Sequence, residues 1–390
     1  MSKNARRLVL FFISFALLTQ PMMVFAEEEL PAAIIVNADI PCRSAILIEQ
    51  KSGKVLFEKQ PDEKMPPASI TKIMTLLLVM EALDSGRIAI DDTVTCSPHA
   101  SSMGGSQIWF EPGEQMTVHE LLKATAIASA NDAAVALGEH IAGSEEAFVA
   151  MMNERAGQLG MKNTTFKNAS GLDIEGHLTT ARDIAIMSAE LLRHPKIKEY
   201  TTIWMDSLRN GETQLVNTNK LVRFFEGATG LKTGTTDDAG SCLSASAERN
   251  GLSLIAVVLG AANSNERFSA ARGLLEYGFA NFEMKAVPAP EPPIAPIPVL
   301  GGVKREVETI GNAPESMLIE KGRAKEITQK ITVEESLFAP VAAGDKVGNV
   351  VVMADGVVVC EYELFAKDDV AKMTFSAAAK MVLQELIRMK

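Results

Sequence analysis

Ser69 and Lys72 are the residues from which a chemical function can first be argued. They are three residues apart, follow Pro66 and Pro67, and open an apolar run at 73–80. Prolines do not continue a preceding helix and serine favours a helix start, so Ser69 is predicted at a helix N-terminus. The spacing then places the Lys72 amine within reach of the Ser69 hydroxyl, and a lysine kept partly neutral by burial can act as its base. The alternative is a capping serine followed by a solvated lysine, because this short pattern is common by chance.

Ser129 and Asn131 form a second polar pair, at the break between helices predicted at 117–130 and 132–141. Serine and asparagine compete with helical hydrogen bonding, so their presence at a junction is structurally natural and indicates nothing by itself.

A third cluster, Lys232-Thr233-Gly234-Thr235, lies on a strand predicted at 231–235. The glycine removes side-chain bulk and lets a ligand approach the strand backbone. The alternative is an exposed edge strand that carries a solvated lysine.

The composition narrows the class of protein. The chain has 390 residues, 47% of them apolar, and a formal net charge of −11. Its length predicts two or three domains, and the absence of a dense Lys/Arg block argues against nucleic acid as a partner. Its four cysteines are scattered without metal-ligand spacing, so we expect no metal site and no cofactor. Isolated buried thiols are expected for most of them, with one disulfide as the alternative.

Residues 1–26 are predicted to be a secretory signal peptide. Lys3, Arg6 and Arg7 precede an apolar run at 8–18, and small residues end the segment at Ala26. An uncleaved membrane anchor is the alternative, although the run is short for spanning a bilayer. The protein is therefore expected to work outside the cytoplasm.

The pattern over residues 27–285 predicts an α+β domain. Strands are expected from both ends of this region, with helices between them, so the simplest arrangement is one mostly antiparallel sheet with the helices packed on it. The predicted strands are 44–48, 55–58, 231–235 and 252–259, the last of them central, and the predicted helices are 69–86, 117–130, 132–141, 145–157, 180–192 and 267–279.

The rest of the chain has a different composition. Residues 286–298 are rich in proline and are predicted to form a stiff linker. Residues 299–369 are expected to be a small all-β domain, with strands at 325–333, 346–354 and 357–365. Residues 370–390 are predicted to be an amphipathic helix that binds an anionic membrane surface, and packing on the β domain is the alternative. Its apolar stripe consists of Phe375, Ala378, Ala379, Val382, Leu386 and Met389.

Taken together, the three clusters carry a resemblance. S-x-x-K, S-x-N and K-T-G occur in this order, with 60 residues from Ser69 to Ser129 and 103 from Ser129 to Lys232. The chain from about residue 44 to its end resembles the active-site serine penicillin-recognising enzymes, and among them the low-molecular-mass penicillin-binding proteins that are D-alanyl-D-alanine carboxypeptidases. The segments 131–136, 171–183 and 217–219 are similar to that family as well. The resemblance implies a β-lactamase/transpeptidase-like domain, an antiparallel sheet with helices on both faces, followed by the small β domain and the terminal helix.

The resemblance also implies a role for each site residue. Ser69 would be the nucleophile, Lys72 its base, and Ser129 a proton relay to the leaving D-alanine. The backbone N–H groups of Ser69 and Thr235 would form the oxyanion hole. His177 is expected to pack its loop rather than transfer a proton, and the loop at 104–106 is expected to lie over the cleft. The expected substrate-binding residues are Asn131, Lys232, Thr233, Gly234, Thr235 and Arg267.

The resemblance implies partners and leaves two alternatives open. The expected substrate is a peptidoglycan pentapeptide ending in D-Ala-D-Ala, with β-lactams as covalent inhibitors, at the outer face of the cytoplasmic membrane of a bacterium. One alternative is a β-lactamase, but 140–220 contains no E-x-x-L-N segment to supply the carboxylate of class A enzymes. The other is a non-catalytic cell-wall scaffold, against which the intact polar clusters argue.

Overall fold

The computed structural model describes residues 40–322 and 326–388. The predicted signal peptide at 1–26 and Met389 of the predicted apolar stripe lie outside the described residues. All four cysteines are described, and each is a free thiol. Cys96 and Cys242 are buried, as the sequence predicted for isolated thiols.

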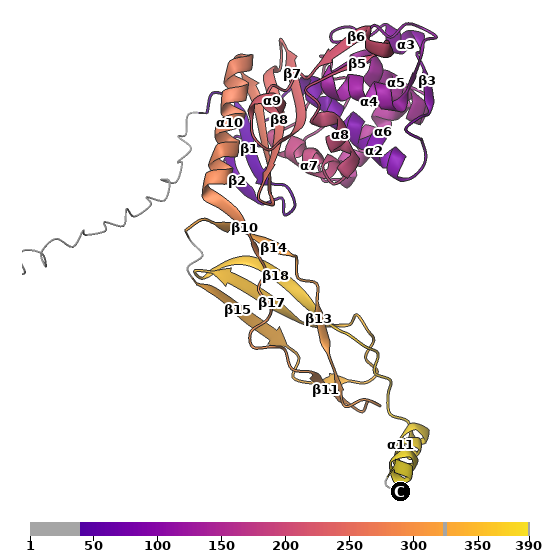
Figure 1. The fold of residues 1–390 in the computed structure, drawn as a ribbon, viewed down its shortest axis with the longest axis vertical. Coiled ribbons are helices and arrows are strands. Elements are labelled where there is room, and N and C mark those ends of the chain that lie inside the picture. The colour runs from indigo at the N-terminus through magenta and orange to yellow at the C-terminus, as the bar shows by residue number, and fades with distance from the viewer. Residues whose placement is uncertain (1–39, 323–325, 389–390) are drawn as a thin grey trace, which may run out of the picture. The chain divides into compact units, whose positions relative to one another are not determined.

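One antiparallel sheet organises the first part of the chain (Figure 1). Its five strands run in the order β2-β1-β9-β8-β7, so strands from both ends of the region lie side by side, which confirms the predicted arrangement. The predicted central strand is β9, which is buried along almost its whole length because both of its faces are covered. The strands are β1 (Ser44–Glu49), β2 (Val55–Lys59), β7 (Ala228–Thr236), β8 (Gly240–Arg249) and β9 (Leu252–Ala261).

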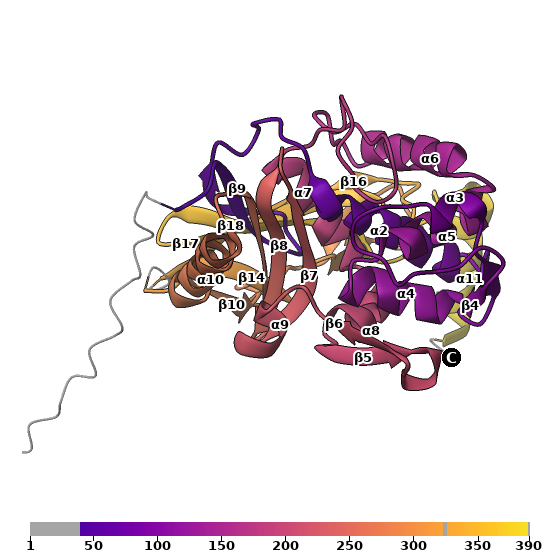
Figure 2. The ribbon, with the colours of Figure 1, turned by 90° about the horizontal axis from the view of Figure 1, so that it is seen from above.

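Helices cover both faces of this sheet, as expected (Figure 2). α10 (Ser264–Asn281) packs on β8 and β9 from one side, and α7 (Ala181–Leu191) packs on β9 and β1 from the other. Behind α7 lies the larger apolar core, which α2 (Lys72–Asp84), α4 (Val118–Ile127), α5 (Asn131–Ala142) and α6 (Glu145–Gln158) share with the sheet.

The local sequence explains where these helices begin. Thr117 and Glu120 form the predicted capping box at the start of α4, with each side chain bound to the backbone of the other residue. Ser144 and Thr180 cap α6 and α7 in the same way through their hydroxyl oxygens. α2 is apolar on all sides because it runs through the core, and ten of its 13 residues are buried.

Short elements at the rim complete this part. They are β3 (Thr93–Thr95) paired with β4 (Gln115–Thr117), β5 (Met205–Leu208) paired with β6 (Thr213–Val216), the helices α3 (Pro98–Ser101), α8 (Lys198–Thr201) and α9 (Leu221–Phe224), and the 3-10 turns η1 (Ala68–Thr71), η2 (Pro195–Ile197) and η3 (Arg209–Gly211).

The proline-rich segment lies between paired strands. β10 (Phe282–Ala286) precedes it and pairs with β14 (Ser316–Glu320), which follows it. The Gln329 amide donates to the carbonyls of Pro288 and Ala289, which holds the segment along β15 (Ile327–Val333). The domain limits expected from the sequence, with a linker at 286–298, remain a prediction.

The strands after the prolines enclose a core of their own. β17 and β18 match the predicted strands closely, and β15 begins two residues later than expected. The elements are β11 (Ile297–Leu300), β12 (Glu306–Val307), β13 (Thr309–Gly311), β15 (Ile327–Val333), β16 (Leu337–Phe338), β17 (Lys346–Ala354) and β18 (Val357–Ala366).

The terminal helix α11 spans Phe375–Arg388, so it starts five residues after the predicted start. Phe375 is 91% exposed, and Leu383 and Ile387 are 60% and 66% exposed. Within residues 40–322 and 326–388, no helix has both the length and the apolar character needed to cross a membrane.

Candidate active site

Ser69 and Lys72 are brought together by a tight turn that leads into a helix. Ser69 lies in η1 and Lys72 is the first residue of α2, so the predicted helix start is correct to within one turn. The alternative of a capping serine is wrong, because no side chain caps η1 or α2 and the turn leaves the Ser69 hydroxyl free for another partner. Lys72 Nζ lies 3.1 Å from Ser69 Oγ.

The Lys72 amine is fully buried and has three polar neighbours. Besides Ser69 Oγ, they are Asn131 Oδ1 at 2.5 Å and the Ser170 carbonyl at 2.7 Å. A neutral amine has two N–H donors and one lone pair. It can therefore donate to Asn131 and Ser170 and at the same time accept the proton of the Ser69 hydroxyl. This arrangement suits a base and excludes the solvated lysine that was the alternative.

Burial lowers the pKa of Lys72 well below its usual value. The positive charge of Lys232 lowers this pKa further, and the buried Asp132 carboxylate acts in the opposite direction. The positive charge of Lys232 therefore adds to the effect of burial and favours the neutral form of Lys72.

Ser129 and Asn131 lie where α4 gives way to α5. Ser129 adopts a left-handed conformation, with φ 62°, and is 4% exposed. Among the described residues its hydroxyl has no hydrogen-bond partner. Asn131 turns its oxygen to Lys72 and donates from Nδ2 to the carbonyl of Gly104 at 2.6 Å. The loop at 104–106 therefore contacts Asn131, and its expected position over the cleft stays a prediction.

Lys232 lies on β7, at the edge of the sheet, but its side chain is only 1% exposed. The alternative of a solvated lysine is therefore wrong for this residue as well. Nζ donates to the carbonyl of Thr233 at 2.9 Å. Burial, with the nearby Arg267 guanidinium, lowers the pKa of Lys232 to about 7.

Gly234 is needed for a reason that the sequence did not indicate. A Cβ there would lie 3.0 Å from the backbone nitrogen of Ser69 and 3.0 Å from Ala68 Cβ. The glycine thus lets the turn that carries Ser69 approach β7. This packing role is separate from the approach of a ligand that the sequence predicted. On either side of it, the Thr233 hydroxyl donates to Thr218 Oγ1 at 2.7 Å and the Thr235 hydroxyl donates to the Gly234 carbonyl at 2.8 Å.

Arg267 reaches this strand from α10. Nη1 donates to Thr235 Oγ1 at 2.8 Å and to the Gly234 carbonyl at 3.0 Å. The side chain is 8% exposed, and its Nε has no partner among the described residues. Burial lowers the pKa of Arg267, and no carboxylate of the described residues pairs with it. The end of β7 is therefore a cationic region with unused hydrogen-bonding capacity.

Asn168 and Ser170, which the sequence did not single out, hold the turn around Ser69 together with Gly171 of the segment 171–183. The Ser170 carbonyl, a partner of Lys72, is a backbone group, so the residue type at position 170 does not indicate it. Asn168 fixes this carbonyl by accepting hydrogen bonds from the backbone N–H groups of Ser170 and Gly171. Gly171 packs directly on Ala68, where a Cβ would lie 1.9 Å from the Ala68 carbonyl.

His177 packs beneath the same turn, as expected. Its Nδ1 accepts from the N–H of Lys167, so the Nε2–H donates to Thr71 Oγ1 at 2.9 Å. The Thr71 hydroxyl in turn donates to the Ala68 carbonyl at 2.9 Å. Burial lowers the pKa of His177 to about 4, so the ring is neutral near pH 7.

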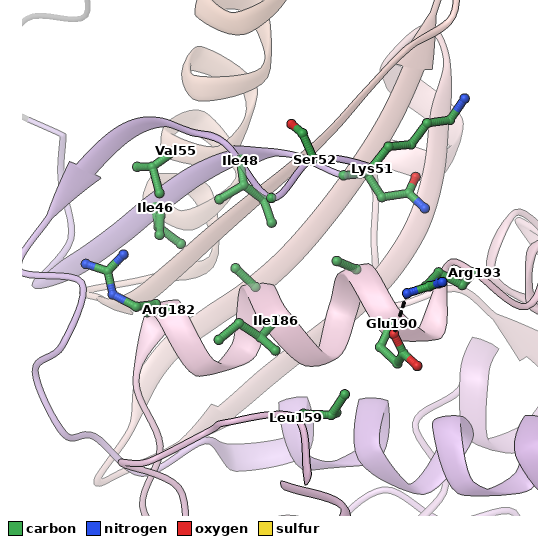
Figure 3. Close-up of a pocket in the computed structure, with 14 residues that line it drawn as sticks. Ile46, Ile48, Lys51, Ser52, Val55, Leu159, Arg182, Ile186, Glu190 and Arg193 are labelled. Carbon is green, nitrogen blue, oxygen red and sulfur yellow. Dashed lines mark ion pairs between the residues drawn. The ribbon is translucent and has the colours of Figure 1, made fainter. Parts of the chain in front are cut away.

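Two cavities lie on this part of the chain. One of about 450 Å³ adjoins the turn, and its walls include Pro67, Ala68 and Gly171. The other, of about 620 Å³, lies between β1, β2 and α7, where Ile46, Ile48 and Val55 face Ile186 (Figure 3). It contains none of the predicted site residues, and its Arg193 and Glu190 form an ion pair with each other, so it is not the active site.

Comparisons with known proteins identify the family of the chain. The family model of D-alanyl-D-alanine carboxypeptidases, peptidase S11, matches residues 31–263. The model of the C-terminal domain of penicillin-binding protein 5 matches residues 282–372.

Individual proteins match over most of the chain. D-alanyl-D-alanine carboxypeptidase DacF of Bacillus subtilis is 43% identical over 352 residues, which cover 89% of this chain and 90% of DacF. D-alanyl-D-alanine carboxypeptidase DacC of Escherichia coli is 35% identical over 370 residues, which cover 93% of this chain and 91% of DacC. Among solved structures, penicillin-binding protein 5 from Haemophilus influenzae matches with a TM-score of 0.79 and 32% identity, over 87% of this chain and 100% of that one. Penicillin-binding protein D2 from Listeria monocytogenes, solved in its ampicillin-bound form, matches with a TM-score of 0.57 and 34% identity, over 62% of this chain and 99% of that one. The chain belongs to the peptidase S11 family of D-alanyl-D-alanine carboxypeptidases.

Proposed function

We propose that this protein removes the terminal D-alanine from peptidoglycan stem peptides that end in D-Ala-D-Ala. The observation that carries the proposal is the buried Lys72 amine, which can accept the Ser69 proton while Asn131 and Ser170 take its own N–H groups. Family membership supports the reaction class, serine-type carboxypeptidase hydrolysis.

The first half of the reaction forms an acyl-enzyme. Ser69 Oγ attacks the carbonyl carbon of the penultimate D-alanine, and its proton passes to Lys72 Nζ. The negative charge on the carbonyl oxygen is stabilised by the backbone N–H groups of Ser69 and Thr235. The close approach of β7 to the turn at Gly234 supports this pairing of donors from the two elements. The C–N bond then breaks as Ser129 relays the proton from Lys72 Nζ to the nitrogen of the departing D-alanine, so Lys72 is neutral again.

The second half restores the enzyme. Water attacks the ester carbonyl and loses a proton. Ser69 Oγ takes up this proton as the ester bond breaks, so the Ser69 hydroxyl is restored and the shortened peptide leaves. Asn131 holds the amide of the acyl chain during both steps. Lys232, Thr233, Thr235 and Arg267 hold the C-terminal carboxylate of the substrate. The buried and incompletely bonded guanidinium of Arg267 supports this last role.

We propose a cell-envelope location for this activity. The N-terminal pattern of residues 1–26 supports export, and α11 supports attachment to a membrane surface. Phe375, Leu383 and Ile387 are largely exposed on α11, and Lys380 provides a positive charge for anionic lipid. Binding of β-lactams at Ser69 is part of the same proposal, and the ampicillin-bound Listeria relative supports it.

The test is release of D-alanine from a peptide ending in Lys-D-Ala-D-Ala. The proposal predicts release by the wild type and none by Ser69→Ala. No release together with rapid turnover of a penicillin would favour a β-lactamase. Absence of both release and a covalent penicillin adduct would favour a scaffold. Deleting residues 370–390 should release the protein from anionic vesicles, and retained binding would contradict the role of α11.

A further inference from the structure

Trp109 is a large aromatic side chain held outside the protein. It is 75% exposed, although its neighbours Ile108 and Phe110 are 2% and 1% exposed. Its backbone has φ 57°, a left-handed conformation that is unfavourable for a bulky residue. Such strain persists only where the surroundings impose it, and it concentrates at functional sites.

Two side chains, the buried Asp132 and the half-buried Arg209, hold this backbone through hydrogen bonds. The Asp132 carboxylate, 0% exposed, accepts from the N–H groups of Ile108 at 3.1 Å and Phe110 at 3.0 Å. Arg209 donates to the carbonyls of Ile108 at 2.9 Å and Trp109 at 3.2 Å. The backbone that carries Trp109 is therefore held in place, and the indole is exposed to solvent.

The loop that carries Trp109 is part of the active-site wall. The Gly104 carbonyl accepts from Asn131 Nδ2 at 2.6 Å, and the Ser106 carbonyl accepts from the Asn131 N–H at 2.7 Å. Asp132, which holds the loop at Ile108, is the next residue along α5. In the proposed function Asn131 binds the acyl chain, the part of the substrate that continues toward the glycan.

Geometry places the glycan at the rim of the cleft rather than inside it. An extended peptide advances about 3.3–3.6 Å per residue, so the four stem residues on the acyl side separate the first sugar from the scissile bond by roughly 13 Å. An exposed indole on a loop that contacts Asn131 is suited to that position.

We propose that Trp109 is a stacking platform for a pyranose ring of the glycan strand, an N-acetylhexosamine. This proposal rests on the proposed function. One face of a pyranose presents C–H groups, which pack against the flat indole, while its hydroxyl and amide groups need polar neighbours. The surroundings of Trp109 on the loop provide these, because the other exposed residues are small or polar apart from one proline. They are Ser102, Gly104, Gly105, Ser106, Glu111, Pro112 and Gly113.

The kinetic test compares two substrates with the same pentapeptide, one free and one attached to its disaccharide. Trp109→Ala should lower kcat/KM for the disaccharide substrate about 3- to 10-fold more than for the free peptide, and Trp109→Phe should lower it less. Phe224→Ala is the matched control, since Phe224 is also an exposed aromatic, at 60%, and it should leave this ratio unchanged. Equal losses on both substrates would show that Trp109 only positions the loop. An unchanged kcat/KM on both substrates would show that the indole contacts neither of them. Either of these two results would overturn the proposal.

A binding measurement is independent of catalysis. The chain has two tryptophans, so Trp204→Phe leaves Trp109 as the only indole emitter. Titration of this variant with a trimer of N-acetylglucosamine should change its fluorescence in a saturable way, and an unchanged spectrum would contradict the proposal. If the wild type releases D-alanine from neither substrate, the proposed function fails, and this titration still tests the platform by itself.

Discussion

Lys72 Nζ lies 2.5 Å from Asn131 Oδ1, and this contact takes up one of the two N–H groups that a neutral lysine has. The amide oxygen thereby directs the lone pair of the amine away from itself and leaves it available to Ser69. Because the neutral form of Lys72 is the base, acylation should rise with pH as Lys72 loses its proton, at a pH well below the usual range for lysine.

Asn131→Asp should move this rise to higher pH. A carboxylate at this distance favours the charged ammonium, so the pKa of Lys72 increases, by about one to three units for a close ion pair. The measurement is the rate of acylation by a penicillin between pH 5 and pH 10. Asn265→Asp, at an exposed position on α10, is the matched control and should leave the profile in place. An unshifted profile in Asn131→Asp would show that Lys72 is not the titrating base.

The activity of the wild type should fall at alkaline pH, and Lys232→Arg should abolish this fall. The pKa of Lys232 is lowered to about 7 by burial and by Arg267, so its positive charge is present below that pH and disappears above it. For the free enzyme, kcat/KM on a peptide with a C-terminal carboxylate should therefore fall as pH rises through about 7. Arginine stays charged throughout this range, so the variant should lose this limb of the profile.

A C-terminally amidated peptide provides the control for Lys232. It lacks the carboxylate, so its kcat/KM should not show the same alkaline fall in the wild type. If both peptides respond alike to pH, Lys232 does not act through the substrate carboxylate.

Gly171→Ala should damage the turn that carries Ser69. The new Cβ would lie 1.9 Å from the Ala68 carbonyl, and the position has φ 90°. Overpacking and the left-handed backbone together should lower the free energy of unfolding by about 2–4 kcal/mol and slow acylation. Gly157→Ala is the control, because a Cβ on that α6 residue meets no atom within 4 Å. It should raise stability by about 0.5–1 kcal/mol, as measured by urea unfolding. A neutral Gly171→Ala would contradict the packing described for this turn.

His177 should make the protein sensitive to mild acid. Its pKa in the folded protein is about 4, compared with 6.5 as its ordinary value, so the unfolded chain binds more protons between these limits. Stability from the neutral ring is therefore complete above about pH 6.5 and is lost as pH falls toward 4. Between pH 7 and pH 5 the free energy of unfolding should drop by about 2 kcal/mol from this residue. His177→Gln cannot be protonated and should reduce that drop, whereas an equal drop in both proteins would assign it to other groups.

The sequence predicted most of the sheet, and its failures have physical causes. β9 was recognised because its apolar run is long and continuous, whereas the neighbouring β8 was missed. β8 has small and hydroxyl-bearing residues with weak strand preference, Ser241, Ser244, Ala245, Ser246 and Ala247 among them, and pairing on both sides makes it a strand. The prolines at 286–298 indicated a linker, but proline content cannot reveal that β10 pairs with β14 across them.

The site could be predicted only as far as side chains define it. Ser69, Lys72, Asn131 and Lys232 were identified by motif, and the structure brings them around one buried amine. Ser129 and Arg267 lie where the motifs and the resemblance suggested, and their catalytic and binding roles stay predictions. The Ser170 carbonyl and the fit of Gly171 on Ala68 depend on tertiary contacts, which a single sequence does not encode in residue type.

The central claim is that Ser69 is the nucleophile and that neutral Lys72 activates it. The most direct measurement is peptide mapping by mass spectrometry after a brief incubation of the wild type and Lys72→Arg with benzylpenicillin. In the wild type, the account predicts a covalent penicilloyl group on Ser69. In Lys72→Arg it predicts no adduct, because the guanidinium keeps the positive charge but does not take up the serine proton. An adduct on any other residue, or rapid modification of Ser69 in Lys72→Arg, would contradict the account.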